Sequence, residues 1–237
     1  MSPVRVPPSA QVLAAHVGDG HPLPGALGDV ELWLAGSSRF RSFIDANRDK
    51  VRKKVRLATT DDARRDLLAE LRVAALLVAD RRIGLAFEAY GSGNRGPDFT
   101  GTFGGGQPFN LEVTRRRTGS ADGLERTILG KLRQLPPSRA NVLVLALDAH
   151  PQTVDLAVIM HEIRARIDRR DDAWIVAHGI DGAATAGKGM LRLSAVIAWP
   201  TAEESRRSPT TWVNAGARVA IPRPTVMALA TALSNAT

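Results

Sequence analysis

The chain has 237 residues, 44% hydrophobic and 24% charged, a balance typical of a globular protein large enough to bury a substantial core. It lacks cysteine, which excludes disulfides and thiolate metal sites, and it has neither an apolar run of the ~20 residues that cross a bilayer nor a signal core, so we expect a cytoplasmic protein without a membrane partner. The net charge of +8, mostly from arginine, favours a polyanion partner, although an arginine-rich composition can also reflect coding bias.

The first part of the chain combines a proline-rich arm with a basic helical region. Residues 1–29 carry several prolines and little periodicity, and we expect a loose arm there. Apolar residues then recur at helical spacing between Val30 and Arg56, with Ser37 or Ser38 as the candidate cap. The opposite face is strongly basic and is either a solvated helix surface or a surface that follows phosphates, with candidate contacts Arg48, Arg52, Lys53 and Lys54.

A second helix and a short strand are expected next. Residues 59–80 show an apolar stripe, with Thr60 or Asp61 as the cap and Glu70 at the edge of the stripe. An acid in such a place is usually a surface residue, but Glu70 precedes an acidic hairpin and is therefore a candidate site residue. Residues 82–90 alternate between apolar and other positions and predict a strand.

The stretch from Gly96 to Arg117 places two carboxylates on neighbouring strands. Asp98 stands at the start of one strand, and a turn rich in glycine and proline follows it. Side chains alternate between faces from Phe109 to Arg116, so Glu112 and Thr114 share the face that points away from the apolar residues. We expect the hairpin to bring Asp98 and Glu112 side by side, and two adjacent carboxylates suit a hard cation such as Mg²⁺.

The second half of the chain alternates between predicted helices and strands. A helix is expected over 124–135, and the unbroken apolar run 141–147 predicts a central strand covered on both faces. The later expectations are a helix over 152–167, a short strand over 173–177, a Gly/Ala loop over 181–189, strands over 191–199 and 211–221, and a helix over 225–235. This order predicts one α/β domain over 30–237, with a mixed central sheet flanked by helices and an extension over 173–237.

Several other patterns do not fit a known site. Residues 91–96 match GxGxxG, but Pro97 and the following glycines prevent the helix that a dinucleotide site requires, so no such cofactor is expected. Gly187-Lys188-Gly189 lacks the spacing of a phosphate loop. The five histidines show neither HExxH nor another paired-ligand spacing, and we expect no zinc site.

The order of these features resembles the PD-(D/E)xK nuclease superfamily, which has the restriction-endonuclease-like fold. The matching segment covers residues 59–147: a helix with Glu70, Pro97-Asp98 at a strand, Glu112 on the next strand, then a helix and an apolar strand. The resemblance implies a phosphodiesterase that uses Mg²⁺ or Mn²⁺, with Asp98 and Glu112 as metal ligands and Glu70 as an auxiliary acid acting through water. It also implies a nucleic-acid substrate, DNA more often than RNA, and cleavage of a duplex would favour a homodimer.

One position departs from the family pattern. The motif lysine belongs two residues after Glu112, where this chain has Thr114. Thr114 can position a water molecule but carries no charge, and Arg116 on the same face is a poor base. We expect Lys131, on the following helix, to provide the ammonium group. Gln134 is expected on the same helix as a contact to phosphate or water, although both residues also fit a plain exposed helix face.

Basic residues beside the acidic pair fit a phosphodiesterase. Arg115, Arg116 and Arg117 follow Glu112 at close range and are expected to hold flanking phosphates, while the metal neutralises the carboxylates. The favoured hypothesis is a metal-dependent endonuclease. The second is a nucleic-acid-binding module that kept the fold and lost turnover together with the lysine, and the third is an interaction protein whose acidic pair is incidental.

Overall fold

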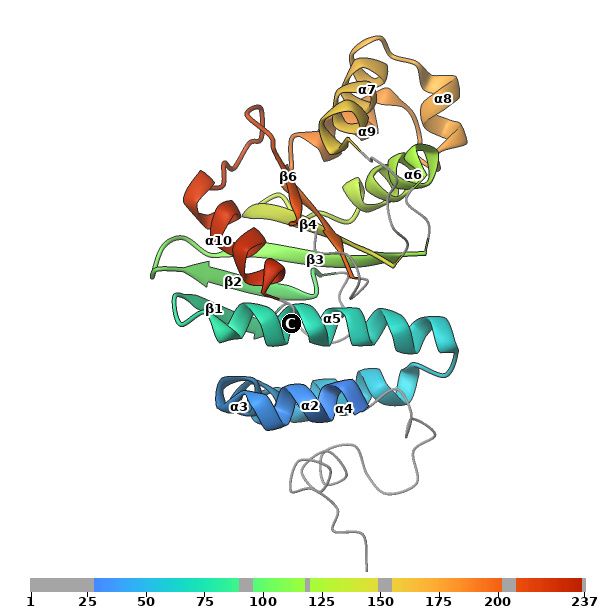
Figure 1. Ribbon diagram of the computed structural model, residues 1–237. Coiled ribbons are helices and arrows are strands. Elements are labelled where there is room, and N and C mark those ends of the chain that lie inside the picture. Colours follow the sequence, from blue (N-terminus) through green and yellow to red (C-terminus); the bar gives the residue numbers. More distant parts are fainter. Residues whose placement is uncertain (1–27, 90–95, 118–119, 149–154, 202–207, 236–237) are drawn as a thin grey trace, which may run out of the picture. The chain divides into compact units, whose positions relative to one another are not determined.

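The structure is a computed structural model that describes residues 28–89, 96–117, 120–148, 155–201 and 208–235 (Figure 1). The chain forms two compact units, Met1–Arg81 and Arg82–Thr237, and each is described by itself. Nearly all of the predicted N-terminal arm and of the GxGxxG pattern lies outside the described residues. Among the described helices, none is long and apolar enough to span a membrane.

The first unit contains four described helices. They are α2 (Gly28–Gly36), α3 (Ser38–Ala46), α4 (Arg48–Leu57) and α5 (Asp61–Ala79). The helical region predicted before residue 57 is broken twice. At the first break the hydroxyl of Ser37 accepts the N–H of Phe40 at 3.1 Å, and at the second the side chain of Asn47 donates to the Phe43 carbonyl at 2.8 Å.

Helix α5 is the longest element of this unit. It begins as predicted, because the Thr60 hydroxyl accepts the N–H of Ala63 at 3.2 Å. Its apolar stripe is buried against α2 and α3, with Ala74 and Leu77 fully inaccessible, and Phe40 of α3 is equally buried. The burial of this stripe is the principal stabilisation of the four helices.

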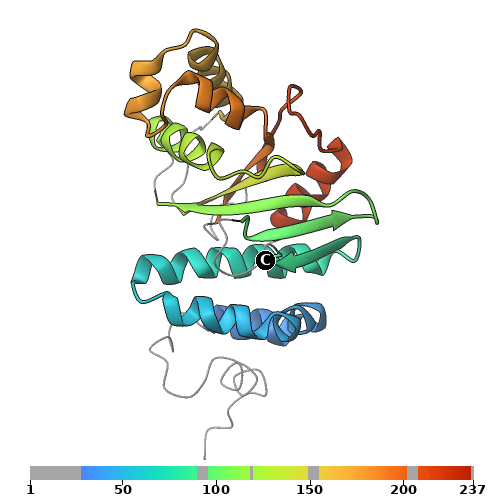
Figure 2. The same cartoon turned by 180° about the vertical axis from the view of Figure 1, so that it is seen from behind.

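The second unit is built on a six-stranded mixed sheet (Figure 1 and Figure 2). Its strands follow chain order: β1 (Ile83–Phe87), β2 (Phe99–Phe103), β3 (Phe109–Arg116), β4 (Ala140–Leu147), β5 (Leu193–Pro200) and β6 (Thr210–Val213). The pairs β3–β4 and β4–β5 are parallel and the other three pairs are antiparallel. The predicted α/β class with a mixed sheet packed against helices is confirmed.

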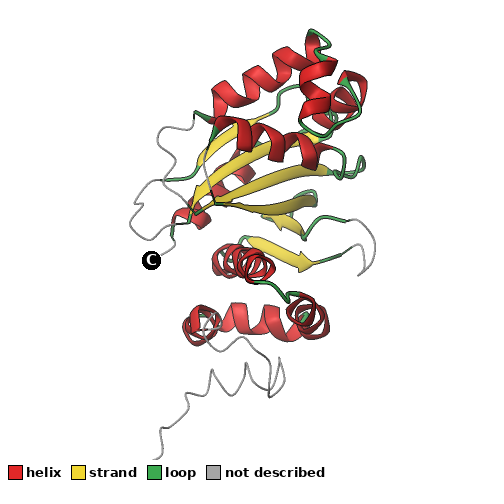
Figure 3. Cartoon of the chain, turned by 90° about the vertical axis from the view of Figure 1, so that its right-hand side faces the viewer, coloured by secondary structure: helices red, strands yellow, loops and turns green. Residues whose placement is uncertain are grey.

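Helical crossovers join the parallel strands, because strands of the same direction cannot be connected by a tight turn. Helix α6 (Ala121–Leu132) joins β3 to β4, and α7 (Leu156–Asp168), α8 (Asp172–Ala177) and α9 (Ala183–Met190) lie between β4 and β5. These helices and one face of the sheet share an apolar cluster. Helix α10 (Arg223–Ser234) packs against β5 and β6. Figure 3 shows the strands of the sheet in yellow with helices packed against them. Strand β4 is buried along its whole length, as its apolar run predicted.

Three predicted elements after residue 170 are wrong. The strand expected over 173–177 is helix α8, because Asp171 caps it by accepting the N–H of Trp174 at 3.2 Å. The loop expected over 181–189 is helix α9, whose first N–H, on Ala183, donates to Asp172 at 2.6 Å. The strand expected over 211–221 ends at Val213, because the Asn214 side chain donates to the backbone carbonyls of Met190, at the end of α9, and Leu193, at the start of β5, both at 2.8 Å.

Close packing of α9 on α6 depends on a glycine. A Cβ atom at Gly189 would lie 2.6 Å from the Cβ and 2.9 Å from the carbonyl oxygen of Leu132, whereas a Cβ at Gly187 would meet its nearest atom, on Ile167, at 3.6 Å. We therefore expect Gly189→Ala to lower the free energy of unfolding by about 1–3 kcal/mol. Gly187→Ala is the control and should change it by less than about 1 kcal/mol, in the stabilising direction. Urea denaturation measures both, and equal effects would contradict this packing.

Candidate functional site

The hairpin of β2 and β3 places the two predicted metal ligands opposite each other. Phe99 pairs with Leu111 and Thr100 with Asn110 in an antiparallel register. Continued by one residue, this register sets Asp98 against Glu112. Directly opposite residues of an antiparallel pair project on the same face, so both carboxylates lie on one side of the sheet. The structure therefore brings Asp98 and Glu112 together as the sequence predicted.

Glu112 is largely buried and has one negatively charged neighbour, Asp98, and one positively charged neighbour, Lys131. Its side chain is 12% exposed, and its Oε1 accepts a hydrogen bond from Lys131 Nζ at 2.6 Å. Burial raises the pKa of Glu112, the negative charge of Asp98 raises it further, and Lys131 partly offsets both effects. Water and Lys131 together therefore stabilise the negative charge of ionised Glu112 only in part. A second cation at this place would be favourable.

Asp98 is fixed by the strand that carries its partner. Its Oδ2 accepts the backbone N–H of Val113, the neighbour of Glu112, at 2.9 Å. This bond crosses from the start of β2 to the middle of β3. It fixes the orientation of the Asp98 carboxylate beside Glu112.

Two buried hydroxyls share the face of the carboxylates. Thr114 follows Glu112 by two residues on β3, and Thr100 follows Asp98 by two residues on β2. The Oγ1 atoms of both are buried and have no hydrogen-bond partner among the described residues. Buried polar atoms normally have partners, so these hydroxyls suit a bound water molecule or ligand. Thr100 was not predicted from the sequence, although its position two residues after Asp98 indicates that both side chains lie on the same face of the strand.

Helix α6 brings Lys131 to the strand. Glu112 is in register with Leu143 of β4, and Leu143 shares an apolar cluster with Ile128 of α6, so α6 covers the face to which Glu112 belongs. Lys131 lies in the last turn of α6, where its ammonium reaches Glu112. The prediction that Gln134 lies on the same helix is wrong, because α6 ends at Leu132. Gln134 is exposed beyond that end.

The three consecutive arginines after Thr114 have different surroundings. Arg115 is 6% exposed and donates to the Asp148 carboxylate at 2.6 Å. Arg116, on the face of Glu112, lies against the start of α6, with its Nη2 3.0 Å from the place that a Cβ on Gly123 would occupy. Arg117 is exposed. Arg115 is therefore poorly accessible to a phosphate, whereas Arg117 is open to solvent.

The remaining predicted site residues belong to the first unit. Glu70 of α5 accepts a hydrogen bond from Lys54 of α4, with Nζ and Oε2 2.5 Å apart. Helix α4 reads RDKVRKKVRL, and Arg48 and Lys53 on it are exposed, whereas Arg52 and Lys54 are half-buried. The auxiliary role of Glu70 at a metal bound by the second unit stays a prediction.

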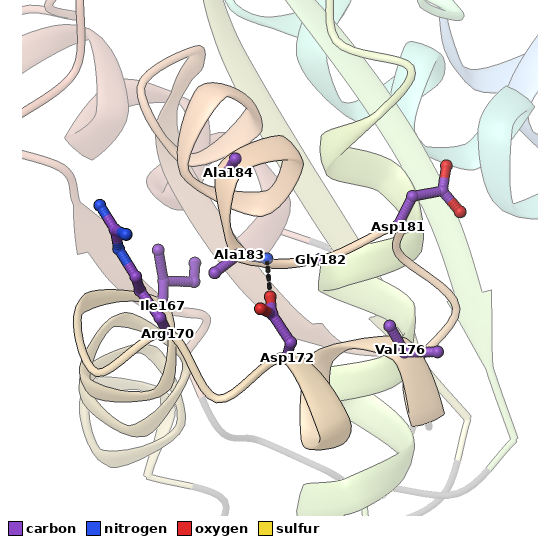
Figure 4. Close-up of a pocket in the computed structure, with 8 residues that line it drawn as sticks. All are labelled: Ile167, Arg170, Asp172, Val176, Asp181, Gly182, Ala183 and Ala184. Carbon is purple, nitrogen blue, oxygen red and sulfur yellow. Dashed lines mark hydrogen bonds between the residues drawn. The ribbon is translucent and has the colours of Figure 1, made fainter.

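A pocket of about 550 Å³ lies elsewhere in the second unit, where α7, α8 and α9 meet (Figure 4). Its polar groups do not converge: Arg170 and Asp181 stand at its two ends, and Asp172 is bonded to the N–H of Ala183 at 2.6 Å. No predicted site residue lines it. The residues around it are Ile167, Arg170, Asp172, Val176, Asp181, Gly182, Ala183 and Ala184.

Comparisons of the chain with protein-family models, with curated proteins and with solved structures find no match. A function is therefore inferred from the geometry of the residues alone. The candidate site consists of Asp98, Glu112 and Lys131, with the hydroxyls of Thr100 and Thr114 on the same face. Two carboxylates, an ammonium group and two hydroxyls can hold a hard cation and direct a water molecule.

The raised pKa of Glu112 predicts that its ionised form destabilises the folded protein, and this can be tested. A carboxyl group whose pKa is raised by folding favours the folded state at low pH, and this contribution is lost as the pH rises through the folded-state pKa. We expect Glu112→Gln to raise the melting temperature at pH 7–8, because the neutral amide avoids the desolvation and the repulsion by Asp98. The gain should shrink as the pH falls towards the ordinary value for glutamate, 4.5.

The control for this measurement is Glu162→Gln. Glu162 is 38% exposed and paired with Arg166 at 2.6 Å, so loss of its charge should not stabilise the protein. Thermal unfolding followed by circular dichroism measures both variants. A Glu112→Gln variant that is less stable than the parent at pH 7–8 would contradict the electrostatic reading of the site.

Proposed function

We propose that this chain is a metal-dependent nuclease with a restriction-endonuclease-like core, and that it hydrolyses phosphodiester bonds of DNA with Mg²⁺ or Mn²⁺. The observation that carries the proposal is the environment of Glu112: a desolvated carboxylate opposite Asp98, with the Lys131 ammonium 2.6 Å away. The order α5, β1, β2, β3, α6, β4 also supports it, because this is the order of elements that the resemblance to PD-(D/E)xK nucleases implies.

The residues at the site fit a hard divalent cation. Asp98 and Glu112, on adjacent strands, repel each other, and the charge of Glu112 is further disfavoured by burial, which is the arrangement that a cation relieves. Asp98 and Glu112 would hold the ion, and the auxiliary role of Glu70, which belongs to the first unit, stays a prediction. When bound, the ion would act as a Lewis acid on the phosphate and would neutralise the acidic pair.

The chain's own residues would direct the attacking water. Lys131 takes the role of the motif lysine from a helix instead of from the strand position that Thr114 occupies. Its ammonium would stabilise negative charge that develops on the phosphate. The hydroxyls of Thr114 and Thr100 would orient the water by hydrogen bonding.

Basic side chains of each unit would contact phosphates of the nucleic acid. In the second unit Arg116 and the exposed Arg117 lie next to the site in sequence. In the first unit α4 presents Arg48 and Lys53 to solvent. Contacts of this kind position the substrate through its phosphates and carry no sequence information.

Cleavage of supercoiled plasmid with Mn²⁺ tests the proposed reaction. We expect Asp98→Asn, Glu112→Gln and Lys131→Met each to reduce the rate by at least about 100-fold, because each removes charge from the reacting centre. Lys188→Met, an exposed lysine on α9, is the matched control and should cleave like the parent. Glu70→Gln should increase the Mn²⁺ concentration that half-maximal cleavage requires.

The outcomes separate the hypotheses. Cleavage by the parent and by the control, but not by the three site variants, supports the nuclease. Binding of DNA by the parent without cleavage in any divalent metal would favour the alternative function, a nucleic-acid-binding module on the same fold. This alternative is favoured by Thr114, which stands where the family has its lysine.

The salt dependence of DNA binding tests the role of α4. Each phosphate contact contributes about −0.9 to the slope of log K against log salt concentration for duplex DNA. Arg48→Ala together with Lys53→Ala should therefore make that slope less negative by roughly 2. Arg223→Ala, an exposed arginine at the start of α10, is the control. Filter binding or fluorescence anisotropy over a salt series gives the slopes, and unchanged slopes in the double variant would exclude α4 as a contact surface.

A further inference from the structure

A second group of potential metal ligands lies where α6 and α8 meet. Asp122 and Glu125 stand in the first turns of α6, and His178 follows the last residue of α8. His178 Nε2 lies 3.2 Å from Asp122 Oδ1 and 3.9 Å from Glu125 Oε2. One ligand atom from each of the three residues lies within 4.8 Å of the others. No residue of this group belongs to the site formed by Asp98 and Glu112.

The imidazole of His178 is held in a metal-binding orientation. Its Nδ1 is 2.7 Å from the carbonyl oxygen of Trp174, and since a carbonyl only accepts, Nδ1 carries the hydrogen. In the neutral ring the lone pair is then on Nε2. The His178 side chain is 5% exposed, and Nε2 is buried without a hydrogen-bond partner among the described residues. A backbone carbonyl bonded to the far nitrogen is the usual support of a histidine ligand.

The two carboxylates that face Nε2 differ in mobility. The Glu125 side chain is 14% exposed, and its Oε2 lies 3.9 Å from His178 Nε2. Asp122 is 71% exposed, and its nearest cation is Arg126, at 3.9 Å. Glu162 and Arg166 of α7 also act on Glu125, with opposite signs. A lone pair on Nε2 that faces two carboxylates is repelled, and either a proton on Nε2 or a metal ion between the three groups relieves this repulsion.

We propose that Asp122, Glu125 and His178 bind a zinc ion. Zinc lies about 2.0–2.2 Å from nitrogen and carboxylate ligands, so the ligand atoms of a tetrahedral site are roughly 3.3 Å apart. The separation of His178 Nε2 from Asp122 Oδ1, 3.2 Å, already has this value. Glu125 is slightly farther, and the exposed Asp122 side chain is free to adjust its rotamer. Three protein ligands leave a fourth position for water.

The ligand set selects a different metal from that of the nuclease site. An imidazole with two carboxylates suits zinc and neighbouring transition metals, whereas Mg²⁺ prefers oxygen ligands alone. The zinc ion would connect α8 to α6, the helix that carries Lys131. The sequence shows no zinc spacing because two ligands lie on α6 and the third follows α8. This inference does not depend on the proposed nuclease activity.

Trp174 provides a direct readout of the site. Its ring lies against that of His178, with ring centroids 3.9 Å apart. Titration of the full chain with ZnCl₂ should therefore change tryptophan emission at about one equivalent, and Trp174→Phe should remove the change. Calorimetry should give the same stoichiometry, and CoCl₂ should produce the visible absorption of a four-coordinate Co²⁺ site.

Substitution of the three proposed zinc ligands tests the proposal. Loss of a group that only hydrogen bonds to a metal ligand weakens binding by about 10- to 100-fold, so Glu125→Gln and His178→Gln should each weaken zinc binding by at least about 100-fold. Asp122→Asn, at an exposed position that the fold does not need, should weaken it in the same direction. His161→Gln, an exposed histidine on α7, is the control and should bind zinc like the parent, as should Asp98→Asn. The absence of zinc binding by the parent, or equal binding by the ligand variants and the control, would overturn the proposal.

Discussion

Repulsion between Asp98 and the buried carboxylate of Glu112, opposed in part by the Lys131 ammonium, is the interaction on which the candidate site depends. Asp98 and Glu112 are set against each other by the register of β2 and β3, and Lys131 compensates Glu112 only in part. A protein selected for stability alone gains nothing from such a pair, because a buried charge without full compensation is unfavourable. The same imbalance makes the pair a strong attractor for a divalent cation.

The fold keeps this unfavourable group in place through the parallel pairing of β3 with β4. The buried side chain of Asn110 donates to Asn141 at 2.9 Å, and Asn141 in turn donates to the backbone carbonyl of Arg192 at 2.9 Å, which connects β3 to the start of β5. Helix α6 crosses between the two strands, so the same connection that makes the pair parallel also brings Lys131 over Glu112. The site and the core of the sheet therefore have a common support.

The sequence predicted those parts of the molecule whose signal is local. Strand β4 follows from its apolar run, the start of α5 from Thr60, and the β2–β3 turn from glycines such as Gly104, which adopts a φ of 58°. Helices α8 and α9 could not be predicted in this way, because carboxylates at their ends, and not periodicity, decide their conformation. The contact of Lys131 with Glu112 was anticipated from the missing motif lysine, whereas the partner of Arg115, Asp148, is a tertiary contact that no local pattern shows.

The origin of Lys131 on a helix has a consequence for how such chains are recognised. A pattern that demands lysine two positions after the second acid passes over this sequence, although an ammonium group reaches that acid from α6. In such a nuclease the position of Thr114 on the strand would no longer need a lysine and could vary. For a nuclease of the proposed kind, the informative signature would be a lysine in the last turn of the crossover helix, as Lys131 is in α6.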